Sequence, residues 1–167
     1  MSAALDLLAR DVPPDAPAGF RLLDTGGGFN LLFGAVYGCL RDGKVALGFR
    51  VSPRHINPHG TCHGGVLATF ADFGAYSAQR EARLGDVVTP TVSMSMDFVA
   101  PARLGDWIET RTELLRATRT MMFTQSVASV GDRVVFRSSG VFKIGRPADG
   151  PGSTLGDAFA EAEERET

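Results

Sequence analysis

The chain has 167 residues, enough for one domain with a sizeable hydrophobic core, and its apolar (44%) and charged (22%) fractions are typical of globular proteins rather than disordered ones. The formal net charge of -2 gives no electrostatic attraction to nucleic acid or to an anionic membrane, so we expect neither as a partner. The longest apolar run is too short to span a bilayer, the N-terminus lacks the pattern of a signal peptide, and two cysteines are too few for a disulfide framework. These features together predict a cytoplasmic protein.

The two ends of the chain differ in composition from the part between them. Residues 1–19 are expected to form an N-terminal arm with a short helix at Ala4–Arg10, which the prolines that follow would end. Residues 146–167 begin with proline and glycine and finish in an acidic run, which predicts a flexible tail. The folded domain is therefore expected over residues 20–145.

The first half of this domain predicts two strands and a helix. An apolar run at Leu31–Leu40 predicts a strand, and Val45–Val51 predicts a second strand after a turn. The segment Ser52–Cys62, which contains proline, glycine and histidine, predicts a loop. Residues 63–82 have the apolar spacing of a helix.

The second half predicts strands alone, at residues 91–99, about 105–115, about 120–130 and 133–144. Their short connections indicate an antiparallel meander. In the first of them, alternation sets Val92, Met94, Met96 and Phe98 against Thr91, Ser93, Ser95 and Asp97 on opposite faces. One long helix against an antiparallel sheet of about six strands is an α+β fold.

The predicted helix carries a single formal charge between residues 64 and 79, at Asp72. At about 100° per residue, Asp72 lies away from the stripe formed by Val66, Phe70 and Phe73. The face around Asp72 is small and nearly uncharged, and the sheet covers only one side of the helix, so we expect a second subunit to cover the other. A lone carboxylate in such a place is costly unless paired. Asp72 is therefore a candidate functional residue, the alternative being a cap or a solvated charge.

The loop ahead of the helix ends in Gly64 and Gly65. Their bare backbone lets a ligand oxygen approach the first N–H groups of the helix, which have no partner within the helix and lie at its positive end. These are the features of an oxyanion site, whereas a tight turn that needs small residues is the alternative. Asn57 either donates its amide to the same oxygen or holds the loop, and His63 either orients the site or caps the first turn.

Two other kinds of site are not expected in this loop. The histidines His55, His59 and His63 are spaced by four residues, but Pro58 and Gly60 lie between them and disfavour the helix that would bring them together. Cys62 adjoins His63, yet neighbours in sequence seldom face each other as a thiol nucleophile and its base must. We therefore predict no metal site.

Several motifs together resemble those of a known family. They are Asn57, the His63-Gly64-Gly65 triplet, Asp72 in the helix, Gly34-Ala35-Val36-Tyr37 and the segment from Phe98 to Asp106. They resemble the hotdog-fold acyl-CoA thioesterases of the phenylacetate-degradation (PaaI-type) group, in the 4-hydroxybenzoyl-CoA thioesterase superfamily. The resemblance covers about residues 20–144. It implies a long helix wrapped by an antiparallel sheet, in a homodimer or a homotetramer (a dimer of dimers) with active sites at the interface.

The resemblance also implies roles for single residues. The Gly64 N–H would polarise a thioester carbonyl with help from Asn57, and His63 would support the loop. Asp72 would be the general base or the nucleophile. Thr91, where similar enzymes usually have serine, would help to hold the attacking water. Positions that match coenzyme A-binding segments of the family are Gly65, Phe98, Val99, Ala100, Pro101, Arg103, Arg116, Thr118, Arg119 and Thr120.

Helix geometry favours a site shared between subunits. Gly64 and Asp72 are eight residues apart, or roughly 12 Å along a helix, whereas attacking water and carbonyl must approach within about 3.5 Å. Gly64 of one subunit and Asp72 of the other avoid this conflict. We therefore predict hydrolysis of an acyl- or aryl-CoA thioester, with coenzyme A entering as part of the substrate and no metal or organic cofactor.

Two alternatives and one question remain at this point. A hotdog dehydratase or hydratase would need an acid–base pair that the matching positions lack. A non-catalytic acyl-CoA binding module has no obvious need for Asp72. The acyl group is open, because Phe70, Phe73, Tyr76, Met94 and Met96 line a pocket or belong to the core.

Overall fold

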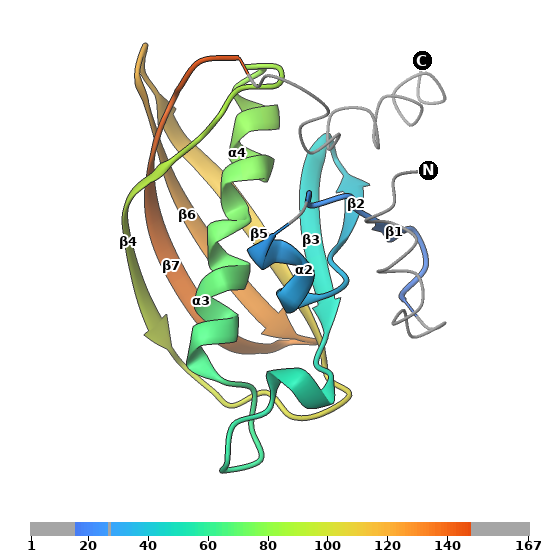
Figure 1. The fold of residues 1–167 in the computed structure, drawn as a ribbon. Helices are drawn as coiled ribbons and strands as arrows, with labels where there is room; N and C mark the ends of the chain where they lie inside the picture. The colour runs from blue at the N-terminus through green and yellow to red at the C-terminus, as the bar shows by residue number, and fades with distance from the viewer. Residues whose placement is uncertain (1–15, 27, 148–167) are drawn as a thin grey trace.

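The computed structural model describes residues 16–26 and 28–147. The predicted helix at Ala4–Arg10 and nearly all of the predicted C-terminal tail lie outside these residues. In the described part, one antiparallel sheet of seven strands curves around a helix that lies along its concave face (Figure 1). The predicted α+β architecture is confirmed, with one strand more than expected. No described helix has the length and apolarity needed to cross a membrane.

The elements follow in chain order, and their bounds are as follows. They are β1 (Arg21–Leu22), α2 (Phe29–Phe33), β2 (Tyr37–Arg41), β3 (Lys44–Arg50), the 3₁₀ turn η1 (Pro53–His55), α3 (Gly64–Asp72), α4 (Gly74–Glu81), β4 (Thr91–Phe98), β5 (Trp107–Ala117), β6 (Met121–Val130) and β7 (Arg133–Lys143). The strand order across the sheet is β1-β2-β3-β5-β6-β7-β4.

The strand predicted at Leu31–Leu40 is wrong in its first half. Residues 29–33 form the helix α2, and the strand β2 begins only at Tyr37. Phe33 is buried at the end of α2, where its ring packs against Phe49 and Phe70 with centroids 4.9 and 6.2 Å away. Gly34, at φ 100°, then turns the chain out of the helix. A short apolar run has no periodicity that separates a strand from a buried helix, and packing decided here.

The predicted turn between the first two strands is confirmed. Arg41 pairs with Lys44, so Asp42 and Gly43 form a two-residue hairpin loop. Both have positive φ, 52° and 72°, which is the backbone of a type I′ turn. Its twist matches the right-handed twist of the flanking strands.

The predicted meander of four strands is wrong in one connection. β5, β6 and β7 do form consecutive antiparallel pairs, but β4 pairs with β7 at the edge and β5 pairs with β3. The helix crosses the face of the sheet between β3 and β4, so the chain re-enters the sheet at its far edge and then returns to its middle. Short connections alone could not reveal this, because the 99–106 loop is long enough to cross the end of the sheet.

The predicted helix at 63–82 is confirmed as α3 and α4, with Phe73 as a single residue between them. Leu67, Phe70 and Ala71 are buried against the sheet, and Asp72 is exposed on the opposite side as predicted. Gly74 allows close approach, because a Cβ there would lie 2.9 Å from the Thr112 hydroxyl oxygen. The helix is therefore fixed in rotation as well as in position.

Gly48 on β3 offers a direct test of this packing. A Cβ at Gly48 would overlap the ring of Trp107 on the paired strand β5. We expect Gly48→Ala to lower the free energy of unfolding by about 1–3 kcal/mol, the usual effect of overpacking, measured by urea denaturation. The loss should shrink in a Trp107→Leu background, because the smaller side chain frees the space. Equal losses in both backgrounds would contradict this account.

Candidate active site

Asp72 and Thr91 meet on the side of the helix that faces away from the sheet's centre. Asp72 is the last residue of α3 and Thr91 the first residue of β4. The Thr91 hydroxyl donates a hydrogen bond of 2.5 Å to the Asp72 Oδ1. Both residues are exposed, and no described cation forms an ion pair with Asp72. The carboxylate therefore keeps one oxygen, Oδ2, for another group.

A β-bulge at the start of β4 makes this contact possible. Thr91 pairs with Phe142 and Ser93 with Val141, so Val92 is an extra residue. Phe142 is buried beneath the helix, and its cross-strand partner Thr91 shares that face. The predicted alternation, which set Thr91 on the same face as Ser93, is therefore wrong at Thr91. A bulge reverses the facing of the residues before it, and period-two reasoning does not detect it.

Asp72 opens into a groove with a volume of about 520 Å³. The groove lies between the helix and the segment 86–90, and Asn30 of α2 contributes to its wall. Among the apolar candidates of the sequence, Phe73 and Tyr76 line this groove. Phe70 is fully buried, and Met94 and Met96 pack against the same core. The groove thus offers a carboxylate beside a partly aromatic wall.

At the other end of α3, the helix begins with His63, Gly64 and Gly65. His63 is the N-cap, and its Nδ1 accepts a hydrogen bond of 2.9 Å from the Gly65 N–H. No described residue accepts a hydrogen bond from the Gly64 N–H. The ring of Phe98 lies 3.4 Å from where a Cβ on Gly64 would be. Gly64 thus presents an unbonded amide at the positive end of the helix, beside an aromatic wall.

Asn57 uses its side chain within the loop. Its Nδ2 donates to the Thr61 hydroxyl at 2.9 Å, and its Oδ1 accepts from the backbone N–H groups of His59 and Thr61 at 2.9 and 3.2 Å. In the isolated chain Asn57 therefore holds the turn before the helix, one of the two roles that the sequence left open. Its assistance to Gly64 remains a prediction.

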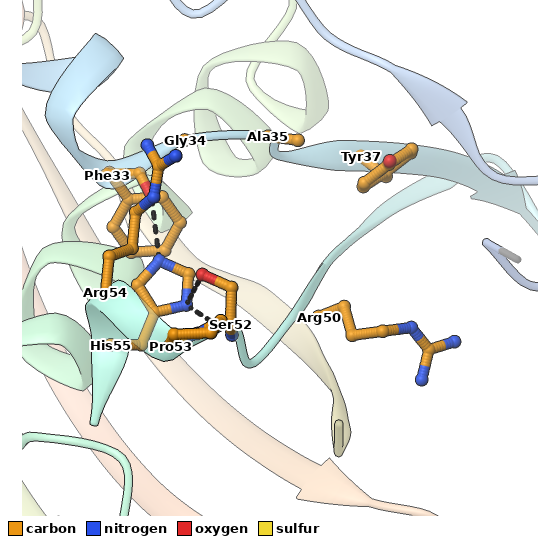
Figure 2. Close-up of a pocket in the computed structure, with 9 residues that line it drawn as sticks. All are labelled: Phe33, Gly34, Ala35, Tyr37, Arg50, Ser52, Pro53, Arg54 and His55. Atoms are coloured by element: carbon orange, nitrogen blue, oxygen red, sulfur yellow. Dashed lines mark hydrogen bonds between the residues drawn. The ribbon is translucent and has the colours of Figure 1, made fainter. Parts of the chain in front are cut away.

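His55 stabilises the loop before α3 through both of its ring nitrogens (Figure 2). It is 4% exposed; its Nδ1 accepts from the Ser52 N–H at 3.0 Å, and its Nε2 lies 2.7 Å from the Phe33 carbonyl oxygen. Burial lowers the pKa of His55 from its ordinary value of 6.5, so the neutral ring donates from Nε2. Both ring nitrogens are occupied, and His55 has neither free as a metal ligand. Across residues 16–26 and 28–147, no three His, Cys, Asp or Glu side chains gather as a metal site.

A second cavity, with a volume of about 490 Å³, lies beside His55, and Figure 2 draws the residues that line it. It is lined by residues of the 33–37 and 50–55 segments and includes neither Asp72 nor Gly64. The second cavity is therefore separate from the candidate site around Asp72 and Gly64.

Cys62 is a buried free thiol just before the N-cap. Burial raises its pKa to about 11, which keeps the sulfur protonated at neutral pH. The protonated sulfur is a poor nucleophile, in agreement with the expectation that Cys62 does not carry the chemistry.

The residues predicted to bind coenzyme A fall at two ends of the protomer. Phe98, Val99, Ala100, Pro101 and Arg103 lie before β5, near Gly64. Arg116, Thr118, Arg119 and Thr120 lie at the far end of β5 and in the turn after it. β5 has 11 residues, and a strand of that length spans roughly 33 Å. One protomer therefore does not bring the two sets together.

The second set lies toward the end of the sheet that carries Thr91. Thr91 pairs with Phe142, Phe142 pairs with Met122, and the Ile144 N–H donates to the Thr120 carbonyl at 2.8 Å. Each protomer thus carries one set near Gly64 and the other set toward the end that carries Asp72.

Comparison with known proteins identifies the family. Residues 59–136 match the family model described as "Thioesterase superfamily". The chain is 33% identical over 132 residues to the Pseudomonas aeruginosa protein named "Putative esterase PA0474", covering 78% of this chain and 98% of that protein. The chain belongs to the thioesterase superfamily. A human relative, acyl-coenzyme A thioesterase 13, is 34% identical over 84 residues, covering 49% of this chain and 58% of the relative.

Solved structures agree on the fold. The zebra fish thioesterase superfamily member 2 matches with a TM-score of 0.65 at 22% identity, over 73% of this chain and 90% of that one. A Streptococcus pneumoniae thioesterase protein solved with coenzyme A gives 0.59 at 22%, over 75% and 98%. The Escherichia coli PaaI protein gives 0.59 at 18%, over 68% and 85%. These structures confirm the hotdog fold that the sequence motifs implied, and the family model and the Pseudomonas aeruginosa relative confirm the superfamily.

Sequence reasoning missed two features of the site, the bulge at Val92 and the packing of Phe98 against Gly64. The bulge leaves no mark in the alternation of residue types. The packing depends on a pair separated by 34 positions, Gly64 and Phe98, which meet because β4 lies beside α3 in the fold.

The ionisation of Cys62 can be tested with iodoacetamide at pH 8. Two pKa units separate the folded thiol, at about 11, from its ordinary value of 9.0, so thiolate-dependent alkylation should be at least about 100-fold slower in the native protein than in urea. Peptide mass spectrometry resolves Cys62 from Cys39. Equal rates in the two states would return Cys62 to the list of candidate nucleophiles.

Proposed function

We propose that this protein hydrolyses an acyl- or aryl-CoA thioester to the carboxylic acid and coenzyme A. The observation that carries the proposal is the Asp72–Thr91 pair, an exposed carboxylate in a groove with one oxygen held by a hydroxyl and no described cation beside it. Two relatives support the substrate class, because one is named as an acyl-coenzyme A thioesterase and another was solved with coenzyme A.

The chemistry begins with the thioester carbonyl. Its oxygen accepts a hydrogen bond from the Gly64 N–H, where the helix dipole stabilises the negative charge that develops during attack. The Phe98 ring beside Gly64 provides an apolar wall next to this position. Stabilisation is strongest in the transition state, where the oxygen carries most charge.

Asp72 supplies the second half of the reaction. In one route, Asp72 takes a proton from water as the water oxygen attacks the carbonyl carbon, and the departing coenzyme A thiolate then takes that proton. In the other route, the carboxylate itself attacks the carbonyl carbon, the C–S bond breaks to release the coenzyme A thiolate, and water then hydrolyses the mixed anhydride to the acid and the free carboxylate. The Thr91 hydroxyl donates to Asp72 Oδ1 and keeps lone pairs that accept from the water, which fits the first route directly.

A second copy of the chain completes the site in this proposal. Gly64 and Asp72 begin and end α3, so one rigid helix holds them roughly 12 Å apart. β4 is an edge strand with Val92 and Phe98 more than half exposed, a surface suited to strand pairing with another copy. In such a homodimer, Gly64 and Phe98 of one subunit face Asp72 and Thr91 of the other. The two sets of coenzyme A-binding candidates then combine in the same way.

Substitution of Asp72 tests the chemistry. Asp72→Asn removes the base while keeping the size, and kcat should fall at least about 100-fold in a thiol-release assay on a panel of aryl- and acyl-CoA thioesters. Asp132→Asn, in the exposed β6–β7 turn, should change it less than about two-fold. Near-normal turnover of Asp72→Asn would remove it from the mechanism. Tight binding of the panel by the wild type with no thiol released would instead favour an acyl-CoA binding module.

Mixed dimers test whether two subunits share the site. Gly64→Pro deletes the N–H at the first helical position, where proline is well tolerated, and the extended His63 backbone (ψ 136°) suits a following proline. Co-expressed with Asp72→Asn, it gives about half mixed dimers with one intact site each, hence about a quarter of wild-type activity. Each variant alone should be nearly inactive.

The control for this experiment mixes Asp72→Asn with Asp72→Ala, which lack the same half and should not restore activity. Native mass spectrometry confirms that mixed dimers form. If verified Gly64→Pro/Asp72→Asn dimers show no restored activity, the shared site is contradicted. Full activity in a verified monomer would contradict it as well.

A further inference from the structure

The loop at residues 99–106, between β4 and β5, is hydrogen-bonded to the backbone just ahead of the candidate oxyanion site. The Cys62 N–H donates to the carbonyl of the fully buried Ala102 at 2.8 Å, which ties this loop to the residue before the N-cap His63. Just before the loop, Phe98 ends β4, where it pairs with Phe136 of β7 and lies against Gly64. The sheet therefore positions Phe98, and the loop sets the approach of the chain to Gly64 through the bond between Ala102 and Cys62.

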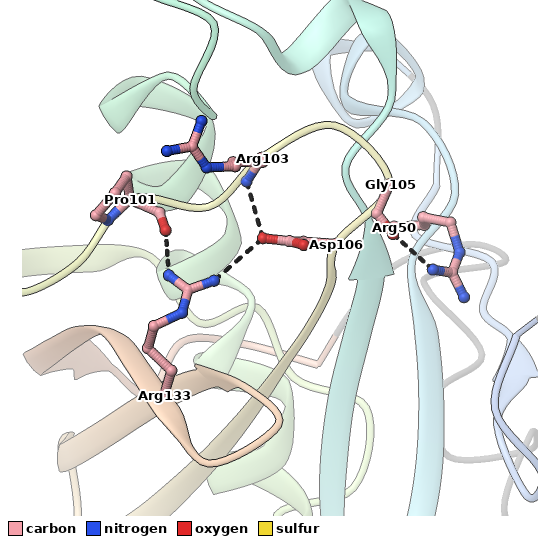
Figure 3. Close-up of polar contacts among 6 residues, drawn as sticks. All are labelled: Arg50, Pro101, Arg103, Gly105, Asp106 and Arg133. Carbon is pink, nitrogen blue, oxygen red and sulfur yellow. Dashed lines mark hydrogen bonds and ion pairs between the residues drawn. The ribbon is translucent and has the colours of Figure 1, made fainter.

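One side chain, Arg133 at the start of β7, holds both halves of this loop (Figure 3). One of its terminal nitrogens donates to the Pro101 carbonyl oxygen, and the other lies 3.3 Å from the Asp106 Oδ2. The same Oδ2 accepts from the Arg103 N–H at 2.9 Å, while the Arg103 side chain points away from Asp106 (Figure 3). A guanidinium can bridge two acceptors in this way because its donors form a rigid planar fork.

The far end of the loop is fixed by different residues. The Gly105 carbonyl accepts from Arg50 at 2.7 Å, and the Gly105 N–H donates to the Val51 carbonyl at 2.9 Å. These contacts anchor residue 105 to β3. At the near end, the Val99 and Ala100 N–H groups donate to the Val135 carbonyl of β7 at 2.8 and 3.2 Å. Arg133 adds the polar contact that holds the Pro101 carbonyl itself.

A second arginine on the same strand provides a contrast. Arg137 pairs with Asp97 at 2.7 Å, but the two side chains are 71% and 62% exposed, against 45% and 25% for Arg133 and Asp106. Arg137 pairs across β7 and β4. Exposed ion pairs contribute little to stability. A comparison of Arg133 and Arg137 variants therefore separates the effect of releasing the loop from the effect of losing an ion pair.

We propose that Arg133 is a positioning residue of the thioester site, an inference that rests on the proposed hydrolase function. Arg133 touches no reacting atom. Its guanidinium holds Pro101 and Asp106 so that the Ala102 carbonyl keeps its hydrogen bond from the Cys62 N–H, ahead of His63 and Gly64. A small displacement of an oxyanion donor weakens transition-state binding more than substrate binding, so the loss should appear in kcat rather than in KM.

The test compares Arg133→Ala with Arg137→Ala, in the full chain. In Arg133→Ala, the Cys62 amide should exchange its hydrogen at least about ten-fold faster by NMR, because its acceptor is no longer fixed. The kcat for the best thioester of the panel should fall about ten-fold with KM changed less than about three-fold. Added millimolar guanidinium should restore part of the lost kcat in Arg133→Ala. In Arg137→Ala, the Cys62 amide exchange rate and kcat should match those of wild type, and guanidinium should have no effect.

A conservative variant covers the case in which Arg133→Ala does not fold. Arg133→Lys keeps the charge near Asp106 but cannot reach both acceptors, so its Cys62 exchange rate and kcat should fall between those of wild type and Arg133→Ala. Unchanged Cys62 exchange in a folded Arg133 variant, or equal kcat losses in the Arg133 and Arg137 variants, would overturn the proposal. Absence of thiol release by wild type, or full turnover of Asp72→Asn, would instead overturn the hydrolase function, and Cys62 exchange would still report on Arg133.

Discussion

Burial of the helix's apolar side against the sheet is the contact on which the rest of this structure depends. Leu67 and Phe70 fit the concave face, and Gly74 lets the helix approach the Thr112 side chain closely. Once that side is fixed, the direction of every other helical side chain is fixed too. Asp72 follows Phe70 by two residues, or about 200° around the helix, so it must point away from the sheet's centre.

The same helix separates the two groups that the proposed reaction uses. Its positive end carries the unbonded Gly64 amide, and its other end carries Asp72. Because a rigid helix cannot bend to bring its ends together, the proposed reaction calls for a neighbouring copy. The distribution of the arginines follows the same division, with Arg103 near Gly64 and Arg116 at the far end of β5.

Irregular backbone carries most of the functional geometry. A one-residue bulge turns Thr91 toward Asp72, and the 99–106 loop holds the backbone ahead of Gly64 through the hydrogen bond from the Cys62 N–H to the Ala102 carbonyl. The polar groups of the segment before α3 are used structurally: His55 joins the 3₁₀ turn to α2, and Asn57 closes the turn before the helix. The regular elements thus provide rigidity, and the departures from regularity aim the side chains.

The sequence by itself determined the helix, the isolation of Asp72, the glycines at the helix start and the hairpin at Asp42-Gly43, because each depends on spacing or on local backbone preference. The motif at Asn57, His63-Gly64-Gly65 and Asp72 also identified the family. Only tertiary structure decided that residues 29–33 are helical, that β4 joins β7, and that Thr91 faces Asp72. These outcomes depend on contacts between residues far apart in the chain, where burial against a distant partner outweighs the local pattern.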